Sequence, residues 1–176
     1  MSALAPPSTV WWKPLGRDER VWVGIGLFWC LVLFAMMWLW PFIGRQNTPA
    51  ESYRVDPATF RARVEAFVAA YRTDTLSGTP VVSPPPGSDV YLMARTFQFY
   101  PILRLKKGET YRLLVSSADM QHGLSIQPAG LNFQILPGYL SVIRLTPTEA
   151  GEFQIVCNEY CGLGHHLMTG KVIVTE

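Results

Sequence analysis

The sequence predicts a mainly β domain that one helix near the N-terminus holds to a membrane. Three observations predict this. From residue 89 onward, short runs of strand-type residues alternate with turn residues. Residues 21–43 form an uncharged, mostly apolar run, and about 20 apolar residues cross a bilayer as a helix. A shorter stretch with helical spacing lies between them. The 176 residues leave room for one modest domain and these additions.

The apolar run at residues 21–43 has two readings, a retained membrane anchor or a cleaved signal peptide. A signal peptide has an apolar core of about 7–15 residues that ends at small residues. This run is longer and ends with bulky residues at Trp38, Trp40 and Phe42. We therefore expect a transmembrane helix over 21–43 that the mature protein keeps.

The orientation of this helix follows from the flanking cations. The basic residues nearest the run are Lys13, Arg17 and Arg20 before it and Arg45 and Arg54 after it. Basic residues concentrate on the cytoplasmic side of a span. This bias places the N-terminal segment 1–20 in the cytoplasm and the rest of the chain at the periplasmic or outer face of the membrane.

Residues 44–88 are expected to hold a short amphipathic helix followed by a linker. Asp56 and Pro57 suit the N-cap and first turn of a helix. Apolar residues then recur at helical spacing, at Phe60, Val64, Phe67, Val68 and Tyr71. This helix over 57–72 could lie on the membrane, on a partner subunit or on the chain's own β domain. Residues 78–87 include three consecutive prolines, which predicts a stiff extended spacer.

Residues 89–176 are expected to form a domain with a Greek-key sandwich. The candidate strands are 90–99, 110–116, 123–127, 131–136, 139–145, 152–157 and 170–175. Seven Lys or Arg and seven Asp or Glu leave this part close to neutral. It has no basic stripe of the kind that binds nucleic acid, and its long-range electrostatic steering of a partner should be weak.

The loop between the last two candidate strands carries a dense set of metal ligands. Cys157, Cys161, His165 and Met168 lie within a dozen residues. Thiolate and thioether select Cu(I), while imidazole accepts either oxidation state of copper. A second Cys points to two metals that share both sulfurs. Of the three histidines in the chain, His122 is the one outside this loop and is the candidate for a second imidazole.

Other interpretations of these residues remain. The two cysteines could form a disulfide, which an extracytoplasmic domain permits. Copper-delivery proteins with a thioredoxin-like fold also carry Cys-x3-Cys, but at a strand-to-helix turn. We interpret His166 as a surface residue, and Met120 and Cys30 as packing residues.

The spacing Cys-x3-Cys-x3-His-x2-Met, with the upstream Asp119-x-x-His122-Gly, resembles the CuA domain of cytochrome c oxidase subunit II. The resemblance covers roughly residues 89–176 and implies a cupredoxin-like Greek-key barrel. It implies a dinuclear copper centre bridged by Cys157 and Cys161. The implied remaining ligands are His122, His165, Met168 and the backbone carbonyl of Glu159. Many members of the family carry a Trp-rich segment beside the metals, whereas here the matching residues 97–100 contain no Trp.

The resemblance implies an oxidoreductase subunit that transfers electrons, without catalytic residues of its own. A periplasmic cytochrome c or small copper protein would supply electrons, and haem in a separate catalytic subunit I would receive them. Such a subunit would serve a membrane haem-copper terminal oxidase. A related nitric-oxide reductase is one alternative, and a membrane-tethered copper-delivery protein is another. The chain has no Cys-x-x-Cys-His haem attachment motif.

Overall fold

A computed structural model describes residues 14, 16–44, 51–127 and 129–176. The chain divides into two compact units, Met1–Gln46 and Asn47–Glu176. The predicted N-terminal segment 1–20 lies largely outside the described residues, and we discuss each unit by itself.

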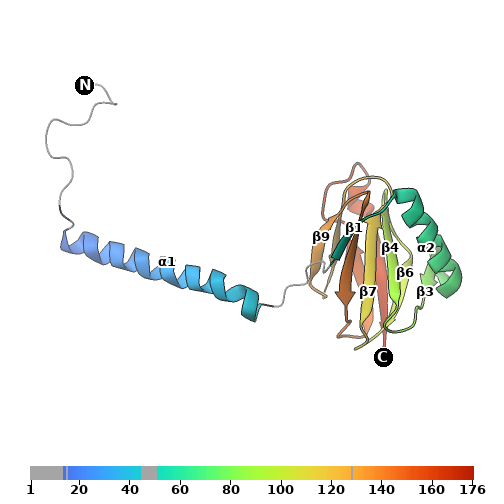
Figure 1. The fold of residues 1–176 in the computed structure, drawn as a ribbon, viewed down its shortest axis with the longest axis horizontal. Coiled ribbons are helices and arrows are strands. Elements are labelled where there is room, and N and C mark those ends of the chain that lie inside the picture. Colours follow the sequence, from blue (N-terminus) through green and yellow to red (C-terminus); the bar gives the residue numbers. More distant parts are fainter. Residues whose placement is uncertain (1–13, 15, 45–50, 128) are drawn as a thin grey trace, which may run out of the picture. The chain divides into compact units, whose positions relative to one another are not determined.

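The first unit contains helix α1, Arg17–Ile43 (Figure 1). Asp18 and Glu19 in its first turn interact favourably with the helix dipole. The helix has 27 residues, which corresponds to a length of about 40 Å. None of its residues is buried within the chain. Its length and composition are those of a helix that can cross a bilayer.

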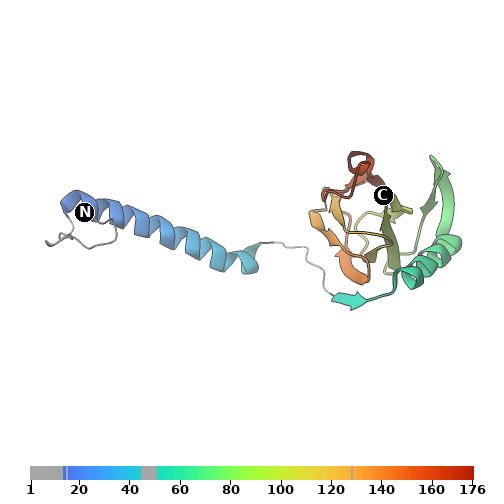
Figure 2. The same ribbon diagram turned by 90° about the horizontal axis from the view of Figure 1, so that it is seen from above.

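The second unit is a curled sheet in which the described residues form twelve strands. Seen from above in Figure 2, the strands curl around the interior of the unit. The main path of neighbouring strands is β1-β10-β7-β4-β5-β12-β11-β8-β9, while β2, β3 and β6 pair beside it. The bounds are β1 Glu51–Arg54, β2 Arg72–Leu76, β3 Thr79–Val82, β4 Asp89–Arg95, β5 Gln98–Tyr100, β6 Ile102–Lys106, β7 Tyr111–Ser117, β8 His122–Ile126, β9 Leu131–Ile135, β10 Tyr139–Leu145, β11 Gly151–Val156 and β12 Thr169–Thr175.

Apolar side chains from most of these strands meet in one core. The core residues with no exposed surface include Leu92, Leu103, Leu113, Leu124, Ile143 and Ile155. They come from β4, β6, β7, β8, β10 and β11. The core therefore fixes the strands on either side of the loop of residues 157–168, which we call the ligand loop.

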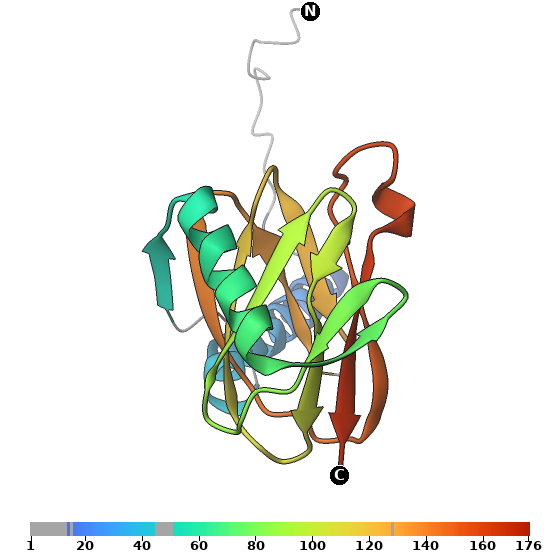
Figure 3. The ribbon, with the colours of Figure 1, turned by 90° about the vertical axis from the view of Figure 1, so that its right-hand side faces the viewer.

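Helix α2, Pro57–Tyr71, packs on this core (Figure 3). The side chain of Asp56 accepts a hydrogen bond from the Thr59 N–H at 2.9 Å, as an N-cap does. Phe60 and Val64 are fully buried, and the Phe60 ring lies 6.0 Å from the ring of Tyr91 on β4. Of the three positions open from the sequence, the helix takes the one on the chain's own β domain.

The strand pattern differs from the sequence expectation in five places, of which two are the additional strands β1 and β2. The single strand predicted over 90–99 is two strands, β4 and β5, which pair antiparallel across a turn. Strand β6 lies between two turn signals and was not predicted. Strand β3 occupies part of the predicted spacer 78–87, where Val81 and Val82 are buried and pair in parallel with β6. Parallel pairing joins segments far apart in sequence, so local residue patterns do not reveal it.

Because of these strands, the β unit begins earlier in the chain than the sequence predicts. The sequence placed its start at residue 89, whereas the compact unit is Asn47–Glu176. Residues 51–88 supply β1, α2, β2 and β3 to it. A fragment that began at 89 would expose the strand surface that α2 covers.

Replacement of Phe60 by Ala tests whether α2 is part of the core. Loss of a buried Phe side chain leaves a cavity, so the free energy of unfolding should fall by about 3–5 kcal/mol. The neighbouring substitution Arg61→Ala is the control, since Arg61 is exposed, and it should change stability by less than about 0.5 kcal/mol. Chemical denaturation of the full chain in detergent measures both. Equal, small effects would mean that α2 adds nothing to the core.

Candidate metal centre

The strand pairing brings the ligand loop to His122. Strand β11 pairs antiparallel with β8 through Ile155 opposite Ile126 and Val156 opposite Ser125. Because the two strands are antiparallel, the residues that follow Val156 run back along β8 toward its first residue, His122. The loop that follows β11 runs through a short 3-10 helix, His165–Leu167, before β12 begins.

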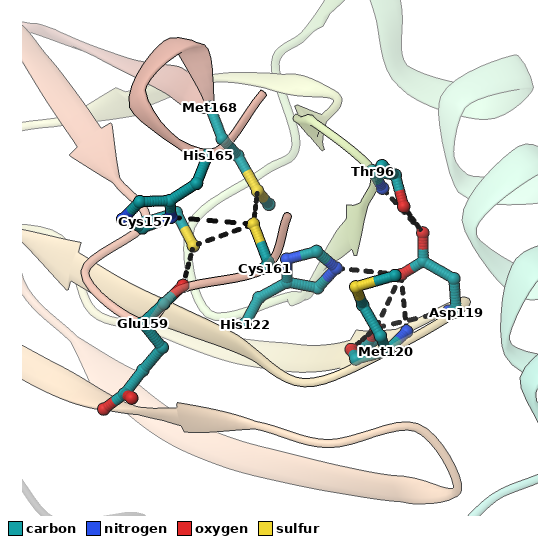
Figure 4. Close-up of polar contacts among 10 residues, drawn as sticks. Thr96, Asp119, Met120, His122, Cys157, Glu159, Cys161, His165 and Met168 are labelled. Atoms are coloured by element: carbon teal, nitrogen blue, oxygen red, sulfur yellow. Dashed lines mark hydrogen bonds and ion pairs between the residues drawn. The ribbon is translucent and has the colours of Figure 1, made fainter. Parts of the chain in front are cut away.

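Three sulfur atoms meet in this loop (Figure 4). The Sγ atoms of Cys157 and Cys161 lie 3.8 Å apart, and the Sδ atom of Met168 lies 3.7 Å from the Sγ of Cys161. All three side chains are buried. Both cysteines are free thiols, since a disulfide requires a sulfur separation of about 2.05 Å.

The imidazole of His122 completes a group of potential ligands with the two thiols. One donor atom from each of these residues lies within 4.8 Å of the others. The Nε2 atom of His122 is 2.8 Å from Oδ1 of Asp119. Its Nδ1 atom is buried and has no hydrogen-bond partner among the described residues. Because an unpaired buried nitrogen is costly, this atom is the one suited to bind a metal.

Asp119 is held by several donors besides His122. Its Oδ2 atom accepts hydrogen bonds from the Thr96 N–H at 2.7 Å and from the Thr96 hydroxyl. Its Oδ1 atom also accepts from the Met120 N–H at 2.7 Å. Partial burial raises the pKa of the Asp119 carboxyl, but the hydrogen bonds from Thr96, His122 and Met120 outweigh it and hold the pKa well below its usual range. The carboxylate therefore stays charged and fixes the orientation of the imidazole.

His165 and Glu159 approach the cysteines from two sides. The Nδ1 atom of His165 is 3.6 Å from the Sγ of Cys161, and the ring of Tyr160 lies edge-on to His165 at 5.9 Å. The backbone carbonyl oxygen of Glu159 is 3.2 Å from the Sγ of Cys157. The carboxylate of Glu159 points away from the sulfurs (Figure 4) and lies 3.4 Å from the side-chain amide of Gln134.

The structure thus gathers all six residues that the sequence proposed as ligands. His165 touches Cys161 but is not in the tightest group, which holds His122 and the two cysteines. His166 is exposed beside it. Met120 is half-exposed and does not behave as the packing residue that we expected.

The donor set suits copper. Two thiols, a thioether and an unpaired imidazole nitrogen are soft or borderline ligands. Burial, followed by the hydrogen bond and charge of Cys157, raises the pKa of Cys161 to about 11, so this thiol is protonated in the metal-free site. A metal that binds there must displace that proton, because the thiolate is the ligand.

Phe97 covers one side of the ligand loop. A Cβ atom added at Gly164 would lie 2.4 Å from the Phe97 ring, and Gly162 has φ +118° and also faces that ring. Only glycine fits these two positions. The glycines of the loop sequence therefore let an aromatic ring pack directly on the backbone between the ligands.

Comparison with known proteins gives the same region. A family model described as "Cytochrome C oxidase subunit II, periplasmic domain" matches residues 99–175. A cytochrome c oxidase subunit 2 from Thermus thermophilus is 36% identical over 88 residues, which are 49% of this chain and 65% of that protein. A second subunit 2 from the same species has the same identity and is covered over 52% of its length. The chain thus covers less than two thirds of either relative.

Solved structures show the fold. A chain of a haem-copper terminal oxidase dimer, determined by cryo-electron microscopy, superposes with a TM-score of 0.58 at 22% identity. That match covers 90% of this chain and all of the other. The copper protein rusticyanin superposes with a TM-score of 0.50 at 18% identity, over 71% of this chain and 98% of its own. The predicted cupredoxin-like β fold with one long N-terminal helix and a second shorter one is confirmed.

Replacement of Asp119 by Ala tests the anchoring of His122. The change leaves the buried Nε2–H of His122 without its acceptor, so the free energy of unfolding should fall by about 1–3 kcal/mol. The exposed ion pair of Asp74 with Arg104 at 3.7 Å supplies a control, because Asp74→Ala should cost less than about 1 kcal/mol. Denaturation of the metal-free chain measures both effects. Nitrogen NMR of His122 should show one tautomer in the parent and a mixture in Asp119→Ala; an unchanged tautomer would contradict the assignment.

Proposed function

We propose that the chain is a member of the cytochrome c oxidase subunit II family, in its short bacterial form, and that it is the electron-input subunit of a membrane haem-copper terminal oxidase; the match of residues 99–175 to the periplasmic-domain model of that family supports this. The observation that carries this proposal is the convergence of His122 with two free, buried thiols and the Met168 thioether. In this proposal the chain's contribution to the oxidoreductase is electron transfer, and oxygen reduction takes place in another subunit.

The cofactor that we propose for this site is a dinuclear copper centre. Cys157 and Cys161 would bridge the two metals, and His122 and His165 would supply one imidazole each. Met168 and the carbonyl of Glu159 would be the weak ligands. Bound there, the centre would accept and release one electron at a time.

The surroundings of these residues favour electron transfer with little rearrangement. The ligands lie at the ends of paired strands or in a loop that packs against them, and the thiols and His122 are buried. Asp119 and Phe97 restrain the site from two further sides. Ligands held in this way keep nearly one geometry in both redox states.

The electron donor that we propose is a periplasmic cytochrome c or a small copper protein. Three apolar side chains of the ligand loop are largely exposed: Tyr160 at 77%, Leu163 at 92% and Leu167 at 69%. Glu159 is the one charged residue between Cys157 and Met168. A donor would therefore dock on this surface through apolar contacts with the loop that carries the candidate ligands.

The remaining features fit a subunit anchored in the bacterial inner membrane. Helix α1 is apolar and long enough to span it, and the matched family model is that of a periplasmic domain. We propose that the N-terminus is cytoplasmic and that the β unit faces the periplasm, in contact with a haem-bearing subunit I.

Affinity purification of the tagged full chain from its native membrane tests the function. The copurified complex should contain a haem-bearing subunit and should consume oxygen with a reduced cytochrome c or small copper protein as donor. The control is the same preparation from cells that express Cys161→Ser, which should lose electron entry. Consumption of nitric oxide without oxygen would favour the reductase alternative, and a chain isolated alone would favour copper delivery.

Substitution of Leu163 by Glu tests the donor surface. The added charge lies on the exposed loop and outside the ligand set, so copper content should stay unchanged. Electron uptake from the donor should slow by about tenfold or more, since one unfavourable interface contact of about 1.4 kcal/mol changes binding tenfold. Leu76→Glu, on the β2–β3 hairpin, is the matched control and should leave the rate unchanged. Equal rates in both variants would place the docking surface elsewhere.

A further inference from the structure

We propose that Asn158 is a positioning residue, and that its hydrogen bond to Asn132 holds the carbonyl of Glu159 at the metal site. This inference rests on the proposed copper function and adds a determinant outside the ligand set. Asn132 lies on strand β9, and Asn158 and Glu159 lie in the first half of the ligand loop. No residue of β9 was expected to contribute to the site.

The ligand loop crosses the face of β8 at Gly123. Strand β11 pairs with β8 only as far as Val156, after which the chain leaves the sheet. A Cβ atom at Gly123 would lie 2.1 Å from Oδ1 of Asn158 and 2.8 Å from the backbone nitrogen of Glu159. These distances mean that residues 158 and 159 rest directly on the Gly123 backbone. Any larger side chain at 123 would push them away from the site.

Beyond this crossing, the loop is tied to β9. The register places Gln134 opposite Gly123 and Asn132 opposite Ser125, so β9 lies along the edge of β8. The side-chain amide of Asn158 donates to Oδ1 of Asn132 at 2.6 Å. The amide of Gln134 lies 3.4 Å from Oε1 of Glu159, a longer and weaker contact. Asn132 and Gln134 are two residues apart and therefore face the same side of the strand.

The contact from Asn158 bears on the site through the next residue. The Glu159 carbonyl oxygen lies 3.2 Å from the Sγ of Cys157. The direction of this carbonyl depends on the backbone of residues 158 and 159. That backbone packs against Gly123, and the side chain of Asn158 is hydrogen-bonded to Asn132. Loss of the hydrogen bond between Asn158 and Asn132 would leave the side-chain ligands in place and allow this carbonyl to rotate. The weak oxygen ligand of one metal would then change in distance or be lost.

A comparison of Asn158→Ala, Asn132→Ala and the double variant in the copper-loaded full chain tests this inference. Both asparagines are exposed, so all three variants should fold and bind the parent amount of copper. The copper hyperfine pattern and the reduction potential should shift by the same amount in each variant, because one bond is lost in all three. Asn132→Asp keeps the acceptor oxygen and should restore the parent spectrum. Gln154→Ala, an exposed residue on β11, is the control.

A second measurement does not use copper. In the metal-free chain, the backbone amides of residues 158–161 should exchange with solvent several-fold faster in Asn132→Ala than in the parent. Parent spectra and exchange rates in Asn132→Ala would overturn the inference, as would shifts that add in the double variant. A parent chain without a two-copper spectrum would instead overturn the proposed function.

Discussion

The hydrogen bond between Asp119 and His122 is the interaction on which the site depends. The bond engages Nε2 of the fully buried His122 imidazole and leaves Nδ1 without a partner, close to the thiols of Cys157 and Cys161. An unpaired buried nitrogen costs about 1–3 kcal/mol. In the metal-free chain this cost is borne because His122 is fully buried and its partner Asp119 is itself held by hydrogen bonds from Thr96. The site is thus prepared for a metal before one arrives.

The same principle extends to the loop. Phe97 packs on Gly164 on one side, and the loop rests on Gly123 on the other. The β unit in turn needs α2, whose Phe60 and Val64 close the core on which β4 and β7 lie. Residues 51–88 are therefore part of the β unit rather than a spacer.

The residues that gather around Cys157 and Cys161 could be predicted from the sequence more completely than the strands could. The ligand spacing around Cys157 is local, so it could be read directly, and the scarcity of histidines left His122 as the partner for His165. The start of α2 was also local, since Asp56 and Pro57 mark it. Strands β3 and β6 were missed because their parallel pairing depends on contacts between distant segments. The positions of Asn158 over Gly123 and of Asn132 on β9 depend on the register of β8 and β9, which residue patterns do not give.

The measurement that tests the central claim most directly is copper stoichiometry, combined with electron paramagnetic resonance, on the full chain reconstituted with copper in detergent. The full chain is required because residues 51–88 contribute to the β unit. We expect two coppers per chain and a spectrum in which one unpaired electron is shared by both nuclei. A single copper per chain, or a silent spectrum with Cys157 and Cys161 joined as a disulfide, would contradict the dinuclear site.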